Sequence, residues 1–132
     1  MPAIREEAAQ AAAWWAGVLG HGDSPVDPGR AAAFERALAE LIEAICADAG
    51  WQPEVPTYGT CGRQLAGGPA PDRALERAAL AAGDRSLLDR LPDVVMWVNP
   101  GEVLVQASGA AEPVQVWPAG AGGGPSTGPR TT

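Results

Sequence analysis

The sequence contains few side chains that could carry out chemistry, and they are poorly grouped for it. His21 is the only histidine and lies among turn-forming residues, without a nucleophile at a recognisable spacing. Cys61 is a conceivable nucleophile, but Arg63 is the one basic residue beside it, and a reactive thiol needs a neighbour that lowers its pKa. Two cysteines and one histidine without close ligand spacing do not predict a zinc site. We therefore expect no catalytic residue, no metal and no cofactor.

The charge balance argues against a polyanionic partner. The chain of 132 residues carries sixteen acidic and nine basic residues, all of the latter arginine, which gives a formal net charge of −7. Phosphate binding needs a basic surface, so we expect no nucleic-acid partner. The Ala/Gly/Pro/Arg-rich, lysine-free usage is typical of a GC-rich bacterial genome, and we expect a bacterial source.

The sequence also lacks the patterns of export and membrane insertion. The first twenty residues contain Glu6 and Glu7 and no uninterrupted apolar stretch, unlike a signal peptide. No window is long and apolar enough to span a bilayer, so we expect no membrane association. Cys46 and Cys61 are too few to staple a secreted mini-domain. A cytoplasmic protein with free thiols is the resulting expectation.

Helical periodicity dominates the first half of the chain. Between residues 4 and 19, apolar residues recur at helical spacing: Ile4, Ala8, Ala11, Trp15 and Val18. Residues 20–29 are rich in turn formers and predict a connection, in which Asp27 caps the next helix and Pro28 occupies its first position. The second helix ends at Gly50, and we expect its buried stripe to consist of Phe34, Leu38, Leu41 and Ile45.

The second half changes from helical to strand periodicity. Residues 51–68 predict an ordered loop with a short strand near residues 63–65, followed by a helix over 71–82 and a short leucine-containing helix that ends at Pro92. Three β-branched runs then predict antiparallel strands over 94–98, 102–107 and 113–117. The sequence therefore predicts an α+β domain over residues 1–118, with about four helices packed against a small antiparallel sheet. Residues 119–132 contain no large apolar residue and predict a disordered tail.

Two segments carry a recognisable pattern. GWQPEVPTYGTCGRQL, residues 50–65, and LPDVVMWVNPGEVLVQ, residues 91–106, resemble the two signature boxes of the BTG/Tob antiproliferative family. The first box is matched by Trp51, Pro53, Glu54, Pro56, Gly59 and Arg63. The second box, with one residue missing before Trp97, is matched by Leu91, Pro92, Trp97, Val98, Pro100, Glu102 and Val103. The resemblance covers about residues 4–117 and implies the fold of that family.

The resemblance also implies a function. Domains of this family are adaptors, and their boxes bind the catalytic deadenylase subunit that shortens messenger poly(A) tails. The family's contact residues are a tryptophan, an aspartate two positions later and a tyrosine, which fall here on Trp97, Asn99 and Gly62. Only the tryptophan is kept. We therefore expect the same deadenylase to bind poorly, because an amide supplies no carboxylate and a glycine supplies no ring.

The hypothesis that follows is a protein-interaction adaptor, without enzymatic activity, whose partner is unknown and by analogy is a nuclease or deadenylase. Its expected binding residues come from both boxes: Tyr58, Gly62, Arg63, Trp97, Asn99, Gly101 and Glu102. The alternative is a small enzyme or ligand-binding protein that uses a cleft between the boxes, with Cys61, Arg63 and Glu102 as polar groups. Two of these residues also have structural interpretations: Trp97 as a core residue, and Arg63 as a bridge to a local carboxylate or carbonyl.

Overall fold

The computed structural model describes residues 4–20, 26–52, 54–55 and 59–118, apart from the side chains of Thr60 and Cys61. His21, Tyr58 and the predicted tail over 119–132 thus lie outside the described residues. The elements follow one another as α1 (Ile4–Leu19), α2 (Pro28–Ala49), the 3-10 helix η1 (Thr60–Arg63), β1 (Gln64–Ala66), α3 (Arg73–Ala81), the 3-10 helix η2 (Arg85–Arg90), β2 (Val94–Asn99), β3 (Glu102–Ala107) and β4 (Val114–Trp117).

The four strands form one sheet in the order β1-β2-β3-β4, with antiparallel neighbours throughout. The strand predicted near residues 63–65 is β1, which pairs with β2 so that Gln64 lies opposite Trp97. The pairing of β3 with β4 shifts register between Val103 and Leu104. Together with the helices, this sheet confirms the predicted α+β fold class.

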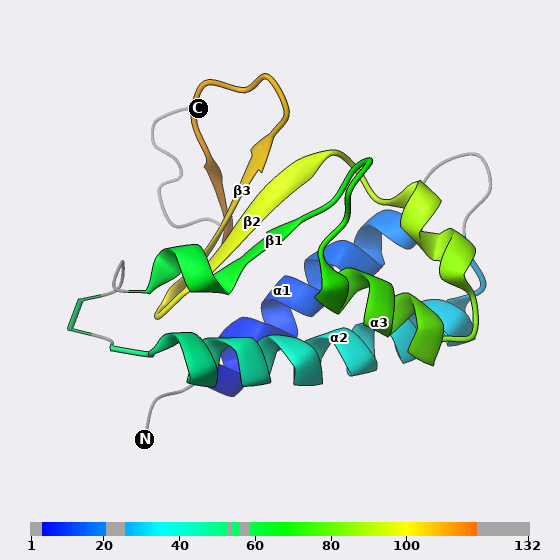
Figure 1. Ribbon diagram of the computed structural model, residues 1–132, viewed down its shortest axis with the longest axis horizontal. Helices are drawn as coiled ribbons and strands as arrows, with labels where there is room; N and C mark the ends of the chain where they lie inside the picture. Colours follow the sequence, from blue (N-terminus) through cyan, green and yellow to red (C-terminus); the bar gives the residue numbers. More distant parts are fainter. Residues whose placement is uncertain (1–3, 21–25, 53, 56–58, 119–132) are drawn as a thin grey trace.

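The helices lie on one side of the sheet (Figure 1). Helix α1 packs against α2 and contacts β2, β3 and β4, while α2 also contacts α3 and η1. Strand residues that face the helices are buried: Val94, Met96, Val98, Val103 and Val105. The residues that alternate with them, Val95, Trp97 and Leu104, remain half-exposed, so the second face of the sheet is open.

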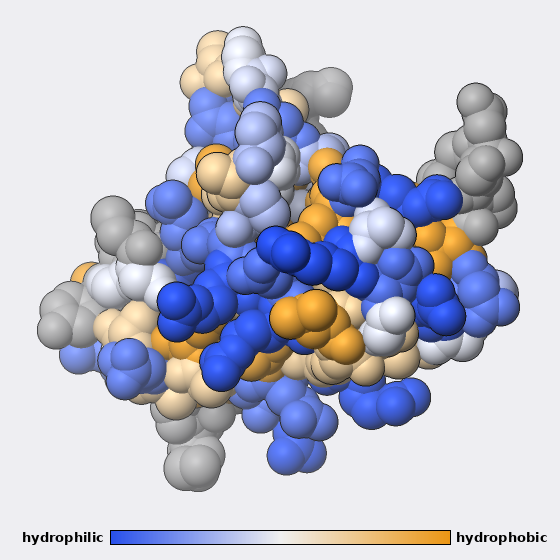
Figure 2. All heavy atoms as spheres, turned by 45° about the vertical axis from the view of Figure 1, so that its right-hand side comes forward, coloured by the Kyte–Doolittle hydropathy of each residue, from blue (hydrophilic) through white to orange (hydrophobic). Residues whose placement is uncertain are grey.

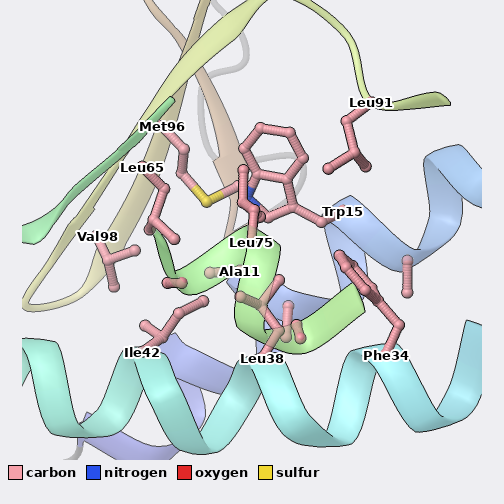
Figure 3. Packing of buried hydrophobic residues seen from close by; sticks show 14 of the residues in the cluster. Ala11, Trp15, Phe34, Leu38, Ile42, Leu65, Leu75, Leu91, Met96 and Val98 are labelled. Carbon is pink, nitrogen blue, oxygen red and sulfur yellow. The ribbon is translucent and has the colours of Figure 1, made fainter. Parts of the chain in front are cut away.

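The core joins α1, α2, α3 and the sheet (Figure 3). Trp15, the largest of its fully buried residues, lies edge-on to the ring of Trp14, with ring centroids 5.1 Å apart. Gly67 follows β1 where the backbone passes close to this core. A Cβ at Gly67 would lie 2.4 Å from the carbonyl oxygen of Pro92 and 3.1 Å from the ring of Trp15. The glycine is therefore required for packing at this position.

The boundaries of α2 follow the predicted capping residues. The Asp27 carboxylate accepts a hydrogen bond from the amide of Arg30 at 3.1 Å, with Pro28 at the start of α2. Gly50 ends that helix at a φ of 103°, which L-residues with a side chain rarely adopt. Asp84 accepts from the amide of Ser86 at 3.0 Å. The segment that begins there is the 3-10 helix η2 in place of the predicted fourth α-helix.

The stripe predicted for α2 is wrong in its second half. The buried residues are Phe34, Leu38, Ile42 and Cys46, whereas Leu41 and Ile45 are half-exposed. Helix α2 has more apolar surface than its neighbouring elements can cover. Because α2 packs against α1 and η1, Ile42 and Cys46 face the core in place of Leu41 and Ile45. Apolar residues accordingly also reach the surface, and Figure 2 shows them in patches bordered by hydrophilic side chains.

The orientation of α2 can be tested with two neighbouring truncations. We expect Ile42→Ala to lower the free energy of unfolding by about 2–5 kcal/mol, because it leaves a cavity in a closed core. Leu41→Ala should cost clearly less, since water can reach that side chain already. Urea denaturation of both variants measures the difference. An equal loss of unfolding free energy in the two variants would show that Leu41 is as deeply packed as Ile42, as the sequence pattern predicted.

Candidate functional site

Trp97 projects from the open face of the sheet. Its ring is half-buried, and the indole Nε1 donates a hydrogen bond to Oε1 of Gln64 at 3.1 Å, across the β1–β2 pair. Leu104 lies opposite Trp97 on β3. With its single donor satisfied by a neighbour, Trp97 presents an oriented aromatic ring, the residue type that most often anchors protein interfaces.

Arg63 lies beneath this surface and is fully buried. Its Nε donates to the carbonyl oxygen of Val98 at 2.6 Å, and its Nη1 donates to the carbonyl oxygen of Gly50 at 2.6 Å. The guanidinium carbon also lies 5.4 Å from the ring centroid of Trp51. Burial lowers the pKa of Arg63, yet an arginine stays charged in proteins. Arg63 thus connects the end of α2 to the end of β2, which agrees with its interpretation as a bridge to local carbonyls.

Asn99 and Glu102 continue the network that begins at Arg63. Asn99 is only 2% exposed, and its Oδ1 accepts from Nη2 of Arg63 at 2.9 Å. Its Nδ2 donates to Oε2 of Glu102 at 3.1 Å, across the β2–β3 hairpin. An amide is suited to this position because it can accept from the guanidinium and donate to the carboxylate. A carboxylate at position 99 would meet Arg63 inside the protein and would oppose Glu102.

Glu7 belongs to the same end of the fold and is a site residue that the sequence pattern did not predict. Its side chain is buried, at 5% exposure, and Oε2 accepts from the amide of Gly101 at 2.9 Å. The other carboxylate oxygen, Oε1, has no hydrogen-bond partner among the residues that the structure describes. The available signal was the position of Glu7, three residues after Ile4 and one before Ala8, within the apolar stripe of α1.

Gly62 lies where η1 crosses the end of α2. A Cβ at this position would lie 2.9 Å from the Cβ of Ala49, closer than real side chains approach. Any larger residue therefore requires η1 to move away from α2. The absence of a tyrosine at position 62 is consistent with this close approach.

The structure thus separates the expected binding residues into two groups. Trp97 and Glu102 are half-exposed, and Gly62 and Gly101 are exposed, so these four can meet a partner. Arg63 and Asn99 are buried and can affect a partner only through the residues that they hold in place. Tyr58 lies outside the described residues.

The alternative of a catalytic or ligand-binding cleft gains no support from the described cavities. Arg63 and Glu102 are connected through Asn99, yet neither lines the described cavities beside η2, between α2 and α3, or beside Trp97. The side chain of Cys61 lies outside the description. Over the described residues, no group of three His, Cys, Asp or Glu side chains is placed to hold a metal ion, and no helix is long and apolar enough to cross a membrane.

Cys46, the free thiol that the structure describes, is buried in the core on α2. Desolvation by burial raises its pKa to about 12, against the opposing effect of the positive charge of Arg63. A thiol with this pKa stays protonated at neutral pH and is a poor nucleophile. Cys46 is therefore a packing residue.

The buried arginine can be tested by two substitutions. We expect Arg63→Met to lower the free energy of unfolding by about 2–5 kcal/mol, because it removes the hydrogen bonds that the guanidinium donates to Val98, Gly50 and Asn99. Arg63→Lys should also destabilise, since an ammonium does not reproduce the planar fork. Arg36→Met, at an exposed position of α2, serves as the matched control and should change stability by less than about 0.5 kcal/mol. Urea denaturation that finds Arg63→Lys as stable as the wild type would contradict the bridging role.

The thiol predicts a stability change at high pH. An unfolded thiol ionises above pH 9.0, whereas folded Cys46 keeps its proton until about pH 12. The folded state then binds more protons than the unfolded state, so stability falls as pH rises between these values, by at most about 1.4 kcal/mol per pH unit. No lysine titrates in this window. Denaturant titrations from pH 8 to pH 11 should show a smaller decline for Cys46→Ala than for the wild type, and parallel declines would contradict the assignment.

Comparison with known proteins supports the resemblance found in the two boxes. The model of the BTG family matches residues 4–117. Among solved structures, the chain is similar to a variant of the C. elegans FOG-3 BTG/Tob domain, with 21% identity and a TM-score of 0.72, over 86% of this chain and 89% of that chain. At this identity the structural likeness shows the fold alone. A comparison with curated proteins finds no match. Because the family model spans most of its length, the chain belongs to the BTG family.

Proposed function

We propose that this domain is a protein-interaction module without enzymatic activity, and that it binds its partner on the open face of the sheet around Trp97. The observation that carries the proposal is the half-exposed indole of Trp97, held by Gln64 on a face that the helices leave uncovered. Aromatic residues in such a position contribute more binding energy than the polar residues around them. Membership of the BTG family supports the same class of function.

The surface around Trp97 has a mixed character that suits a reversible complex. Val95 and Leu104 add half-exposed apolar area, while Gln64, Glu102 and Gln106 provide polar groups at its edge. An apolar centre with a polar rim is the usual composition of non-obligate interfaces. The Arg63 network holds the β2–β3 hairpin and η1 together below this surface, so the partner meets a rigid platform.

The identity of the partner follows the family only in part. Of the three contact positions that the resemblance implies, Trp97 alone offers its side chain to a partner; position 62 is a crowded glycine and Asn99 is buried. A nuclease is the partner class suggested by analogy. The proposal includes a cytoplasmic location, because the described cysteine is a free thiol.

The proposal predicts that binding depends on Trp97 more than on overall charge. We expect Trp97→Ala to remain folded and to weaken partner capture from the native host at least about tenfold, the equivalent of about 1.4 kcal/mol at one hot-spot residue. Arg36→Ala, on an exposed face of α2, is the matched control and should capture the same proteins as the wild type. Quantitative mass spectrometry of the captured proteins, with circular dichroism as the folding check, measures the effect. If the wild type, Trp97→Ala and Arg36→Ala captured identical sets of proteins, Trp97 would not be part of the partner-binding surface.

A further inference from the structure

A second surface lies between α2, α3 and β1. It is a groove of about 570 Å³, with a floor formed mainly by Leu41, Ala44 and Ile45 of α2. Its walls include Gln64 of β1 and the first residues of α3. The groove meets the Trp97 surface at Gln64, which accepts the hydrogen bond of the indole, and Gly62 also lines the groove. The volume is within the range of sites that accommodate side chains or small ligands.

The floor of this groove is apolar surface that the core leaves uncovered. Helix α2 buries Phe34, Leu38, Ile42 and Cys46 in the core. Leu41 and Ile45 each precede one of these buried residues in the sequence, so they lie beside the buried stripe and remain half-exposed. Two half-exposed branched side chains one turn apart match the spacing with which amphipathic helices insert their own apolar residues into a groove. The floor thus fits a segment that presents two aliphatic side chains.

The rim next to α3 carries two positive charges. Arg73 and Arg77 line the groove at an i, i+4 spacing, an arrangement in which two like charges repel each other on the helix surface. Two acids also line the groove, Asp48 on the α2 side and Asp72 before α3, whose carboxylate accepts from the amide of Ala66 at 2.6 Å. Glu76 of α3 binds Arg85 at 2.8 Å instead of either arginine. Neither Arg73 nor Arg77 forms an ion pair within the described part of the chain, so both guanidinium groups can receive a carboxylate of a partner beside the apolar floor.

We propose that this groove binds an amphipathic segment of a partner protein, which places two aliphatic side chains over Leu41 and Ile45 and a carboxylate beside Arg73 and Arg77. The charge complementarity selects an acidic segment over a basic one. Asp48, which also lines the groove on the α2 side, disfavours a second acid there and so orients the segment. This surface differs from the Trp97 surface and does not require that surface to bind.

The test begins with a library of random twelve-residue peptides displayed on phage and selected on the full chain. We expect the enriched peptides to combine a pair of aliphatic residues with Asp or Glu. A synthetic copy of the most enriched peptide should then bind Arg73→Glu/Arg77→Glu about tenfold more weakly than the wild type at low salt, as expected for the loss of two surface ion pairs and their replacement by repulsion. Isothermal titration calorimetry measures the affinities.

Two matched variants make this result specific. Arg36→Glu reverses an exposed charge on α2 outside the groove, and Trp97→Ala removes the anchor of the first surface; both should bind the peptide like the wild type. The double arginine variant should stay folded, because both side chains are exposed and an acid at position 73 is favourable in the first turn of α3. Circular dichroism checks the fold. A loss of peptide binding in Trp97→Ala, with binding retained in the double variant, would assign the peptide to the first surface and overturn the groove.

Three further outcomes would also overturn the proposal. The first is a selection that yields no binding peptide, or only peptides without an acid. The second is a higher peptide affinity after deletion of residues 119–132, which would make the chain's own end the occupant. The third is self-association of the wild type in sedimentation that Ile45→Glu abolishes, which would make the occupant a second copy.

Discussion

The burial of one guanidinium group is the constraint on which this end of the fold depends. Arg63 donates hydrogen bonds to the carbonyl oxygen of Gly50 and to oxygens of the adjacent residues Val98 and Asn99, which lie far from Gly50 in the sequence. A buried charge is costly, and it is tolerated here because several acceptors and the ring of Trp51 surround it. The positions of η1, of the end of α2 and of the β2–β3 hairpin are therefore coupled, because a shift of any one of them would break a hydrogen bond of the buried guanidinium.

Local sequence patterns predicted the elements of this domain better than the contacts between them. Capping by Asp27 and the stop at Gly50 depend on side chains close in sequence, and both were predictable from the local pattern. The rotation of α2 about its axis could not be predicted in this way. Leu41 and Ile42 are both apolar, and the packing of α1 and η1 decides which of the two is buried. Burial of Asn99 was equally hidden, since it depends on Arg63, thirty-six positions away.

The same reasoning explains which parts of the candidate site could be found from sequence. Trp97 and the two boxes were recognisable because their residues stand in a fixed order, and the family match agrees with that order. Their exposure was not encoded locally: the expected binding set mixed surface residues with the two that brace them from inside. A family pattern identifies positions under a common constraint, and only the packed structure distinguishes positions that touch a partner from positions that hold the backbone. The cytoplasmic location and the bacterial source stay predictions.

The contact between Glu7 and the amide of Gly101 joins two points ninety-four positions apart. Such a contact can form only after most of the domain has been made, since synthesis proceeds from the N-terminus and α1 leaves the ribosome long before the hairpin that it must meet. Until then the apolar side of α1 lacks the strands that cover it. Long sequence separation between partners slows folding, because a large loop must close before the contact can contribute. The first helix of this chain is therefore made early but completes its packing late, and a nascent chain that stops before the hairpin would expose the apolar face of α1 to chaperones or to other unfolded chains.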